Sequence, residues 1–476
     1  MNDRIVIFGA ASGAVKALKA LKNIGLDIEF FVDNDKEKHG KFLEGKVICH
    51  PNVLLNDSVP YKIVIASVYH GEIEEQLISM GIKRENIILK EQYILGYIDS
   101  HLGNMIDPTP KYNKNQNYHI FMDLGDGISL GGIEKWGITI AEAFHRRKMQ
   151  VTILTAQADD VMALHTDVPL IRFDMSYERY IESVNEAAKE IIAKLPCVVL
   201  INKINQIYMA AFIVKRFYGE DIKIISVIHS DFARTYEQNQ LVDRYTDAYL
   251  CVSNDVQSHF LTRYPINKEK VFFKDSPIAY DYNYKKKYSP ENEPVRIGYA
   301  GRLEKAQKRA DLLIPLVKKL VELNLPFRME VAGNGSYFNY IQDFILLNSY
   351  SDKVRLHGVI PFDSMVNFWK ECDIVINLSD IEGIGLSMLE AMSYGAVPVV
   401  TDTAGASSFI TYGRNGFVCD RGDTDAIAYH IKELSDNREK LRNYGNASRK
   451  IIKDRCNQDD YMEYLERMIA MEGGKK

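Results

Sequence analysis

Short apolar runs alternate with longer amphipathic stretches along most of the chain, as expected for β-strands separated by helices. The alternation begins at residues 4–8 and restarts near residues 119 and 296. Alternating strands and helices build mostly parallel sheets. The pattern therefore predicts an α/β protein composed of three Rossmann-like units.

Two segments interrupt the alternation. Residues 99–117 lose apolar periodicity and collect proline and asparagine, and residues 281–294 are rich in tyrosine, lysine, proline and asparagine. Both compositions are typical of linkers. We predict a first domain at 1–98, a linker at 99–117, further domains at 118–285 and 294–455, and a helical C-terminal segment at 456–476.

The first unit begins like a nucleotide-binding βαβ fold. A strand at residues 4–8 leads into Gly9 and Gly13, and a second strand at 28–32 ends at Asp33. Such a turn lets phosphate approach the backbone, and the acid can bind ribose hydroxyls. The three-glycine fingerprint is incomplete, so nucleotide binding here is one hypothesis and a docking role is the other. Asp33 also opens an Asp-x-Asp triplet, but its place at a strand end argues against metal binding.

The second unit places a histidine where ligands meet an open parallel sheet. Glycines follow the strand at 119–123, and an amphipathic helix then runs to about residue 146. A later strand, at 223–228, delivers His229 at its carboxyl end, which is the ligand-binding edge of such sheets. The alternative is a histidine whose hydrogen bonds are satisfied by local backbone.

The third unit carries a group of cations at a strand end. The strand near residue 296 ends at Arg302, and Lys305, Lys308 and Arg309 follow before a helix. Charge-assisted bonds from such cations suit a diphosphate. Lys308 is our candidate beside Arg302, and Lys305 and Arg309 remain alternatives to it.

Two glutamates eight positions apart frame a glycine loop in the same unit. An apolar strand at 374–378 precedes them and a helix begins near residue 386. Open backbone and the free N–H groups at the helix start favour a phosphate. Glutamates near a helix start can also merely complement its dipole, and glycines can merely form turns. The residues of interest are Glu382, Gly383, Gly385, Leu386, Ser387 and Glu390.

This stretch resembles the Glu-x7-Glu signature of the retaining, GT-B-fold glycosyltransferases of family 4. Three further features are similar to that family: the Gly-Gly-Ile-Glu sequence at 131–134, the strand-end His229, and Gly-Arg-Leu at 301–303 with a downstream lysine. The resemblance covers roughly residues 117–470. It implies two facing Rossmann-like domains, with a final helix, about 459–471, crossing back to the acceptor-side domain. Residues 1–95 resemble the small Rossmann-like domains of sugar acyltransferases.

The resemblance also implies roles for individual residues. His229 and Glu382 would take part in catalysis on the reacting side. The donor would be held by Gly132, Arg302, Lys308, Gly383, Gly385, Leu386, Ser387 and Glu390. Glu390 would bind the ribose, and the cations would neutralise the diphosphate, so that neither a metal nor a cofactor is expected.

Composition narrows the partners and the setting. A formal net charge of −5 over 476 residues disfavours a nucleic-acid partner. The six scattered cysteines lack a Cys-x-x-Cys pair, and the N-terminus lacks the pattern of a signal peptide. We expect a cytoplasmic protein with reduced thiols. Basic clusters at 146–148 and 285–287 are interpreted as solvated surface, with peripheral contact to the inner face of the membrane left open.

The function predicted from these features is sugar transfer from a nucleotide-sugar to a glycan or lipid-linked acceptor, in surface polysaccharide assembly. The alternatives are a nucleotide-sugar epimerase or phosphorylase of the same fold, and a regulatory protein that binds nucleotide-sugar without turnover. The sequence does not identify the sugar, the base, the acceptor, the linkage, the ligand of the first domain or the oligomeric state.

Overall fold

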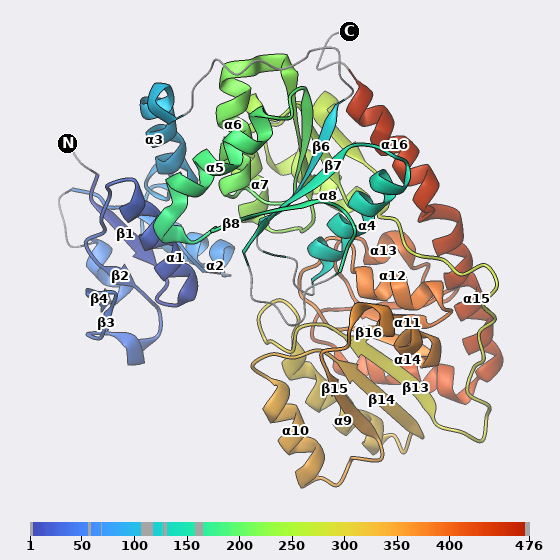
Figure 1. The fold of residues 1–476 in the computed structure, drawn as a ribbon. Helices are drawn as coiled ribbons and strands as arrows, with labels where there is room; N and C mark the ends of the chain where they lie inside the picture. Colours follow the sequence, from blue (N-terminus) through green and yellow to red (C-terminus); the bar gives the residue numbers. More distant parts are fainter. Residues whose placement is uncertain are drawn as a thin grey trace.

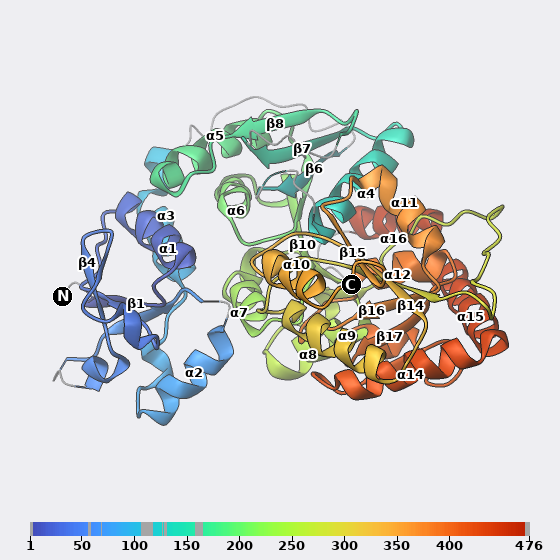
Figure 2. The ribbon, with the colours of Figure 1, turned by 90° about the horizontal axis from the view of Figure 1, so that it is seen from below.

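The computed structural model describes residues 3–55, 59–67, 69–105, 118–125, 127, 131–157 and 165–471. These residues form three units in chain order, each built on one sheet (Figure 1). The N-terminal unit lies beside the second, and the third lies below the second in this view. Figure 2 shows the N-terminal unit on the opposite side of the second unit from the C-terminal helices.

The N-terminal unit has a sheet in the order β3-β4-β2-β1-β5, parallel except for the β3–β4 pair. Its strands are β1 (Ile5–Phe8), β2 (Phe31–Val32), β3 (Phe42–Leu43), β4 (Lys46–Cys49) and β5 (Lys62–Ile65). Its helices are α1 (Ser12–Asn23), α2 (His70–Ser79) and α3 (Lys90–Met105). All of β1 is buried because helices cover both faces of the sheet. The predicted strand at 28–32 is regular only over β2, although the Glu29 amide still donates to the Ile5 carbonyl (2.8 Å).

Helix α3 corrects the predicted start of the first linker. Residues 99–105, assigned to the linker, continue this helix, while residues 106–117 lie outside the described part of the chain. Ile98 and Met105 are buried, and Asp99 pairs with Arg216 of the second unit (3.4 Å). Burial against a neighbouring domain thus sustains a helix that local composition disfavours.

The second unit is a parallel sheet in the order β12-β11-β10-β9-β6-β7-β8. Its strands are β6 (His119–Leu124), β7 (Val151–Ala156), β8 (Leu170–Phe173), β9 (Cys197–Ile201), β10 (Ile222–Ile228), β11 (Ala248–Cys251) and β12 (Val271–Phe273). Its helices are α4 (Gly132–Arg146), α5 (Tyr180–Ile192), α6 (Gln206–Tyr218), α7 (Ala233–Leu241) and α8 (Asn254–Arg263). The uninterrupted apolar run of β9 is fully buried, as a central parallel strand requires.

The third unit is a parallel sheet in the order β15-β14-β13-β16-β17-β18. Its strands are β13 (Val295–Ala300), β14 (Phe327–Ala332), β15 (Val354–Gly358), β16 (Ile374–Asn377), β17 (Val397–Thr401) and β18 (Phe417–Cys419). Its helices are α9 (Leu313–Glu322), α10 (Phe338–Leu347), α11 (Phe362–Glu371), α12 (Leu386–Ser393), α13 (Ala406–Phe409), α14 (Thr424–Asp436) and α15 (Arg438–Arg455). The crossover order places the central β13 and β16 side by side, so the loops after both strands open on the same edge.

The last helix, α16 (Gln458–Ala470), returns from the third unit to the second (Figure 1). It packs against α4, where Arg147 pairs with Asp459 (2.9 Å) and Glu466 (3.0 Å). The buried Tyr461 lies edge-on to Trp136, with ring centroids 6.4 Å apart. This helix therefore ties the two larger units together on the side away from the N-terminal unit.

The N-terminal unit is docked on the second unit through one shared core. Helix α1 packs against the segment that leads into α5, and buried apolar residues of both units form one cluster. Lys19 pairs with Glu178 (2.7 Å), and the Asn23 side chain accepts a hydrogen bond from the Ile181 amide (2.8 Å). The unit is therefore held by apolar burial as well as by polar contacts.

One residue of the predicted basic surface at 285–287 is not solvated. The Lys286 ammonium donates to the carbonyl oxygens of Lys370 (2.7 Å) and Cys372 (2.6 Å) at the end of α11. Burial lowers the pKa of Lys286 to about 8. Its role is to cap α11, which the run of lysines alone does not reveal.

Candidate functional site

The loop after β16 holds Glu382 in a fixed position. The residue is 8% exposed, and its carboxylate accepts hydrogen bonds from Lys308 Nζ (2.6 Å), Ser379 Oγ (2.7 Å) and Asn377 Nδ2 (3.3 Å). Asn377 and Ser379 lie on the same loop, whereas Lys308 comes from the loop that follows β13. The ion pair therefore joins the two strand-end loops predicted from the sequence, and both partners are pre-positioned at the carboxyl edge of the sheet.

Helix α12 begins directly after this loop. Its N-cap is Gly385, which has φ +69°, a conformation that side chains other than glycine rarely adopt. The first turn contains Leu386 and Ser387, whose N–H groups have no carbonyl partner within the helix. The turn therefore offers the backbone donors that bind a phosphate at a helix N-terminus.

The structure separates the candidate cations near Lys308. Arg302 is exposed and bonds to Gln307 Oε1 (2.7 Å) and Glu304 (3.3 Å) on its own loop. Arg309 pairs with Asp311 (3.1 Å) and Asp380 (3.2 Å), and Lys305 lies in solvent. Lys308 is the cation of this group that pairs with Glu382 (2.6 Å). The geometry therefore favours Lys308 over Lys305 and Arg309.

The second unit meets this loop at His229, immediately after β10. A Cβ atom added to Gly383 would overlap the carbonyl oxygen of His229, so the two backbones are in direct contact. Gly132, at the start of α4, lies close to Leu386: an added Cβ would be 3.5 Å from Leu386 Cδ1. These contacts bring the predicted residues of both halves to one interdomain seam.

The tautomer of His229 follows from its neighbours. Asn202 donates from Nδ2 to the Asp123 carbonyl (2.6 Å), which leaves Asn202 Oδ1 facing His229 Nε2 at 2.7 Å. His229 therefore carries its proton on Nε2 and donates it. The imidazole also lies edge-on to Trp136, with ring centroids 5.0 Å apart. Desolvation, with a smaller contribution from the Lys203 charge, lowers the pKa of His229 to about 3.

This pKa leads to a test of acid sensitivity. The unfolded chain protonates this imidazole below about pH 6.5, whereas the folded protein does so only near pH 3. Protonation therefore favours unfolding as the pH falls from 6.5 toward 3. We expect His229→Gln to lose less unfolding free energy than the wild type between pH 7 and pH 5, measured by urea denaturation. Equal losses in the two proteins would contradict a neutral, desolvated imidazole.

Glu390 lies about one turn into α12 and has partners that the sequence did not predict. It forms an ion pair with Lys135 of α4 and accepts a hydrogen bond from Trp369 Nε1 (3.3 Å). The Lys135 ammonium also lies over the ring of Phe362, 3.9 Å from its centroid. Glu390 thus links the two units in this structure, and ribose hydroxyls would have to replace the lysine.

A cavity of about 210 Å³ adjoins this ion pair at the seam. Its walls come from α4, α11, α12 and the chain at residues 277–279, and they are mostly apolar. Lys135, Trp136, Leu386 and Glu390 are among the lining residues. A space of this kind, with a few charged groups at its rim, is typical of ligand sites between domains.

Several residues at the seam were missed by the sequence analysis: Lys135, Trp136, Asn202, Trp369 and Ser379. Lys135 and Trp136 directly follow the Gly-Gly-Ile-Glu sequence at 131–134, and this position is the local signal that could have identified them. No local pattern identifies Asn202 or Trp369 as partners, because each contacts a residue far away in the sequence.

In the N-terminal unit, the predicted nucleotide-binding residues have structural partners. Gly9, with φ +112°, and Gly13 pack against the end of β5, where an added Cβ would lie 3.0 and 3.1 Å from the Ala66 carbonyl oxygen. Asp33 accepts hydrogen bonds from the Ala10 amide (2.8 Å) and Lys38 Nζ (3.0 Å). These contacts explain the residue types without a ligand, and nucleotide binding here stays a prediction.

Within the described residues, no helix is both long enough and apolar enough to cross a membrane.

Comparison with protein families assigns both larger units. Residues 130–273 match the model described as Glycosyltransferase Family 4, and residues 282–451 match Glycosyl transferases group 1. The two larger units therefore define a glycosyltransferase. Both matches agree with the resemblance to family 4 glycosyltransferases that the Glu-x7-Glu loop predicts. Residues 1–88 match a separate model, C2185-like, N-terminal, as expected for an additional domain.

Curated relatives are distant. N-acetyl-alpha-D-glucosaminyl L-malate synthase of Bacillus anthracis is 25% identical over 262 residues, which cover 51% of this chain and 66% of the relative. The capsular polysaccharide biosynthesis glycosyltransferase CapM of Staphylococcus aureus is 26% identical over 179 residues, which cover 37% of this chain and 46% of CapM. The matches thus span less than two thirds of these relatives.

Solved structures confirm the predicted GT-B fold. A Staphylococcus aureus TarM mutant, in complex with Fondaparinux, alpha-GlcNAc-glycerol and UDP, has a TM-score of 0.62 at 12% identity, covering 75% of this chain and all of TarM. Anabaena HepE, in complex with UDP and glucose, has a TM-score of 0.61 at 16% identity, covering 74% of this chain and all of HepE. Identities this low establish the fold alone.

Proposed function

We propose that this protein transfers a sugar from a nucleotide-sugar to a glycan or lipid-linked acceptor. The observation that carries the proposal is the contact of Gly383 with His229, which joins the Lys308–Glu382 pair to the ligand edge of the facing sheet. The two family matches and the polysaccharide-related names of the relatives support it. Surface polysaccharide or glycolipid assembly is the setting we propose.

Each group at the seam has a chemical task in this proposal. Lys308, Arg302 and the first N–H groups of α12 neutralise the diphosphate as it departs. Glu382 accepts hydrogen bonds from the sugar hydroxyls, and Glu390 exchanges Lys135 for the ribose. In this proposal the side-chain cations and backbone N–H groups supply the positive charge for the diphosphate, so the reaction would need neither a metal nor a cofactor.

His229 serves as a neutral hydrogen-bonding group on the acceptor side. With its proton on Nε2 and a lowered pKa, it does not act as a cation near the donor. We propose that the acceptor attacks on the face that the phosphate vacates, which retains the anomeric configuration. NMR of the product anomer tests this, and an inverted product would overturn it.

The alternative activities can be distinguished by the reactants that they need and the products that they release. An epimerase changes the donor without an acceptor, a phosphorylase depends on phosphate, and a regulatory protein binds donor without turnover. We expect nucleoside diphosphate release only when both a nucleotide-sugar and an acceptor extract are present. A thermal-shift panel of nucleotide-sugars would first identify the donor, because a bound ligand raises stability.

The assignment of donor residues is tested by Glu390→Ala and Arg302→Ala. We expect each variant to lose transfer almost completely, because each removes a group that binds the donor, while circular dichroism shows an unchanged fold. Glu390→Ala also breaks the ion pair with Lys135, so Lys135→Met is the matched control. Full activity in both Glu390→Ala and Arg302→Ala would contradict the proposal, whereas a loss in Lys135→Met equal to that in Glu390→Ala would assign the effect to the ion pair.

For the N-terminal domain we propose binding of a nucleotide or nucleotide-sugar near Gly9, Gly13 and Asp33, or docking alone. Calorimetry on the full chain and on Asp33→Ala separates the two, because only a nucleotide site loses heat with that substitution. We also propose a cytoplasmic location, with peripheral contact at the inner face of the membrane tested by vesicle sedimentation.

A further inference from the structure

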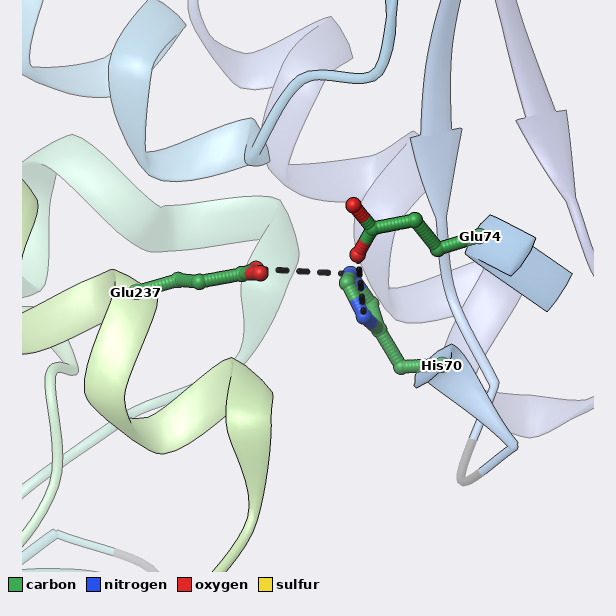
Figure 3. Close-up of side chains that lie close together, drawn as sticks. All are labelled: His70, Glu74 and Glu237. Carbon is green, nitrogen blue, oxygen red and sulfur yellow. Dashed lines mark ion pairs between the residues drawn. The ribbon is translucent and has the colours of Figure 1, made fainter. Parts of the chain in front are cut away.

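A cluster of metal-ligating side chains lies at the junction of the N-terminal unit with the second unit. His70 and Glu74 stand on α2, four residues apart, and Glu237 stands on the facing α7 (Figure 3). Residues at i and i+4 share one face of a helix, so both α2 side chains point toward α7. In the part of the chain that the structure describes, this is the one group of three such residues close enough to share an ion.

The oxygens of the two carboxylates are divided between two partners. Arg84 pairs with Oε1 of Glu74 and with Oε1 of Glu237, the latter at 2.8 Å. The remaining oxygens face the imidazole: Glu74 Oε2 lies 3.9 Å from His70 Nδ1, and Glu237 Oε2 lies 3.8 Å from His70 Nε2. Arg84 therefore orients both carboxylates while leaving one oxygen of each turned to the histidine.

The burial of His70 and its lack of a hydrogen-bond partner at Nδ1 point to a ligand. His70 is 6% exposed, and its Nδ1 atom is buried without a hydrogen-bond partner. Leaving such an atom unsatisfied costs about 1–3 kcal/mol, so buried polar atoms normally have a partner. Both neighbouring carboxylate oxygens are beyond hydrogen-bond distance. An ion between these three groups would supply the missing partner.

We propose that His70, Glu74 and Glu237 bind a divalent transition cation of the zinc type. Imidazole nitrogen and carboxylate oxygen are ligands that zinc accepts, at about 2.0–2.2 Å. The candidate ligand atoms lie within 4.8 Å of one another, so small side-chain movements bring them to such distances.

The residues around the cluster would give an ion access to it and orient the carboxylate ligands. His70, Arg84 and Glu237 line a cavity of about 420 Å³ that opens at the junction, through which a hydrated ion can enter and where water can complete the coordination. The Arg84 contacts correspond to the outer hydrogen bonds that orient carboxylate ligands in metal sites.

The position of the site indicates its role. Two ligands come from the N-terminal unit and one from the glycosyltransferase half, so the ion would fasten one to the other. None of the three residues belongs to the Lys308–Glu382 seam, and the proposed transfer reaction needs no ion there. The inference is therefore independent of the proposed function.

The test uses the full, untagged chain after treatment with a chelator and its removal. Titration with zinc chloride alone, followed by calorimetry and elemental analysis, is expected to give one zinc per chain and a raised melting temperature. Glu237→Gln and Glu74→Gln keep a hydrogen-bonding oxygen for Arg84 but remove a charged ligand. Each is expected to weaken zinc binding more than about tenfold, and His70→Ala is expected to abolish it.

Glu85→Gln is the matched control, because Glu85 lines the same cavity but its carboxylate pairs with Lys83 (3.7 Å), outside the cluster. It is expected to bind zinc like the wild type. Absence of stoichiometric zinc in the wild type, or unchanged zinc affinity in Glu237→Gln, would overturn the proposal. If His70→Ala unfolds, the two isosteric glutamine variants still decide, since their folding is checked by circular dichroism. Absorption spectra of the cobalt-substituted protein that show no nitrogen or oxygen ligands from the protein would also contradict the proposal.

Discussion

Replacing Lys308 with methionine is expected to lower kcat/KM for sugar transfer by at least about 100-fold, the range seen when one charge-stabilising donor is removed. Lys308 contacts Glu382 at 2.6 Å and comes from the strand-end loop that carries Arg302. Without this ammonium, the buried Glu382 loses its counter-charge and repels the diphosphate. The effect should appear in kcat as well as in donor affinity, because negative charge grows on the phosphate as the bond breaks.

Lys305→Met is the matched control for this prediction. Lys305 lies three residues earlier on the same loop, is exposed, and has the same charge. It is expected to change kcat/KM less than about threefold, since exposed charges are screened by water and salt. A large loss in Lys305→Met with little loss in Lys308→Met, measured as nucleoside diphosphate release, would reassign the cation that binds the donor.

Replacing Gly383 with alanine is expected to open the seam between the two larger units and to abolish most transfer. The added methyl group would overlap the His229 carbonyl oxygen, which is backbone and cannot rotate away. Overpacking of this kind typically costs about 1–3 kcal/mol. Because the strain is relieved when the units separate, both the melting temperature and the activity should fall.

Gly96→Ala is a control for which we expect the opposite change in stability. Gly96 lies in the interior of α3, is exposed, and has no atom within 4 Å of an added Cβ. Alanine is favoured over glycine in helices by about 0.5–1 kcal/mol, so this variant should be slightly more stable than the wild type and fully active. Differential scanning calorimetry and the transfer assay together decide. A Gly383→Ala protein as stable and active as Gly96→Ala would refute the close contact.

The glycine loop shows which features of the site could be predicted from the sequence. The run of apolar residues before it, the glycines and the two acids are local features, and they predicted a strand, a loop and a helix where β16, residues 378–385 and α12 lie. The partners of the two acids were less accessible. Lys308 was expected near the same ligand, but Lys135 was not expected at Glu390, because the two residues are 255 positions apart.

Two errors have the same origin. The composition of residues 99–105 indicated a linker, yet burial of Met105 and the contacts of α3 with the second unit sustain a helix. The lysines at 285–287 suggested a solvated surface, yet Lys286 caps α11 through two carbonyl groups. In both places a neighbour distant in sequence supplies the stabilising contact, and local patterns do not reveal distant neighbours.

The sequence by itself determined the α/β class, the three sheet-forming units, and the strand ends that carry His229, Arg302, Lys308 and Glu382. Periodicity and glycine placement encode these features locally. Only the tertiary structure decided which cation meets Glu382, that Gly383 touches the His229 backbone, and that His70, Glu74 and Glu237 face one another. These are contacts across domain junctions, and they depend on how the units pack rather than on the pattern within any one of them.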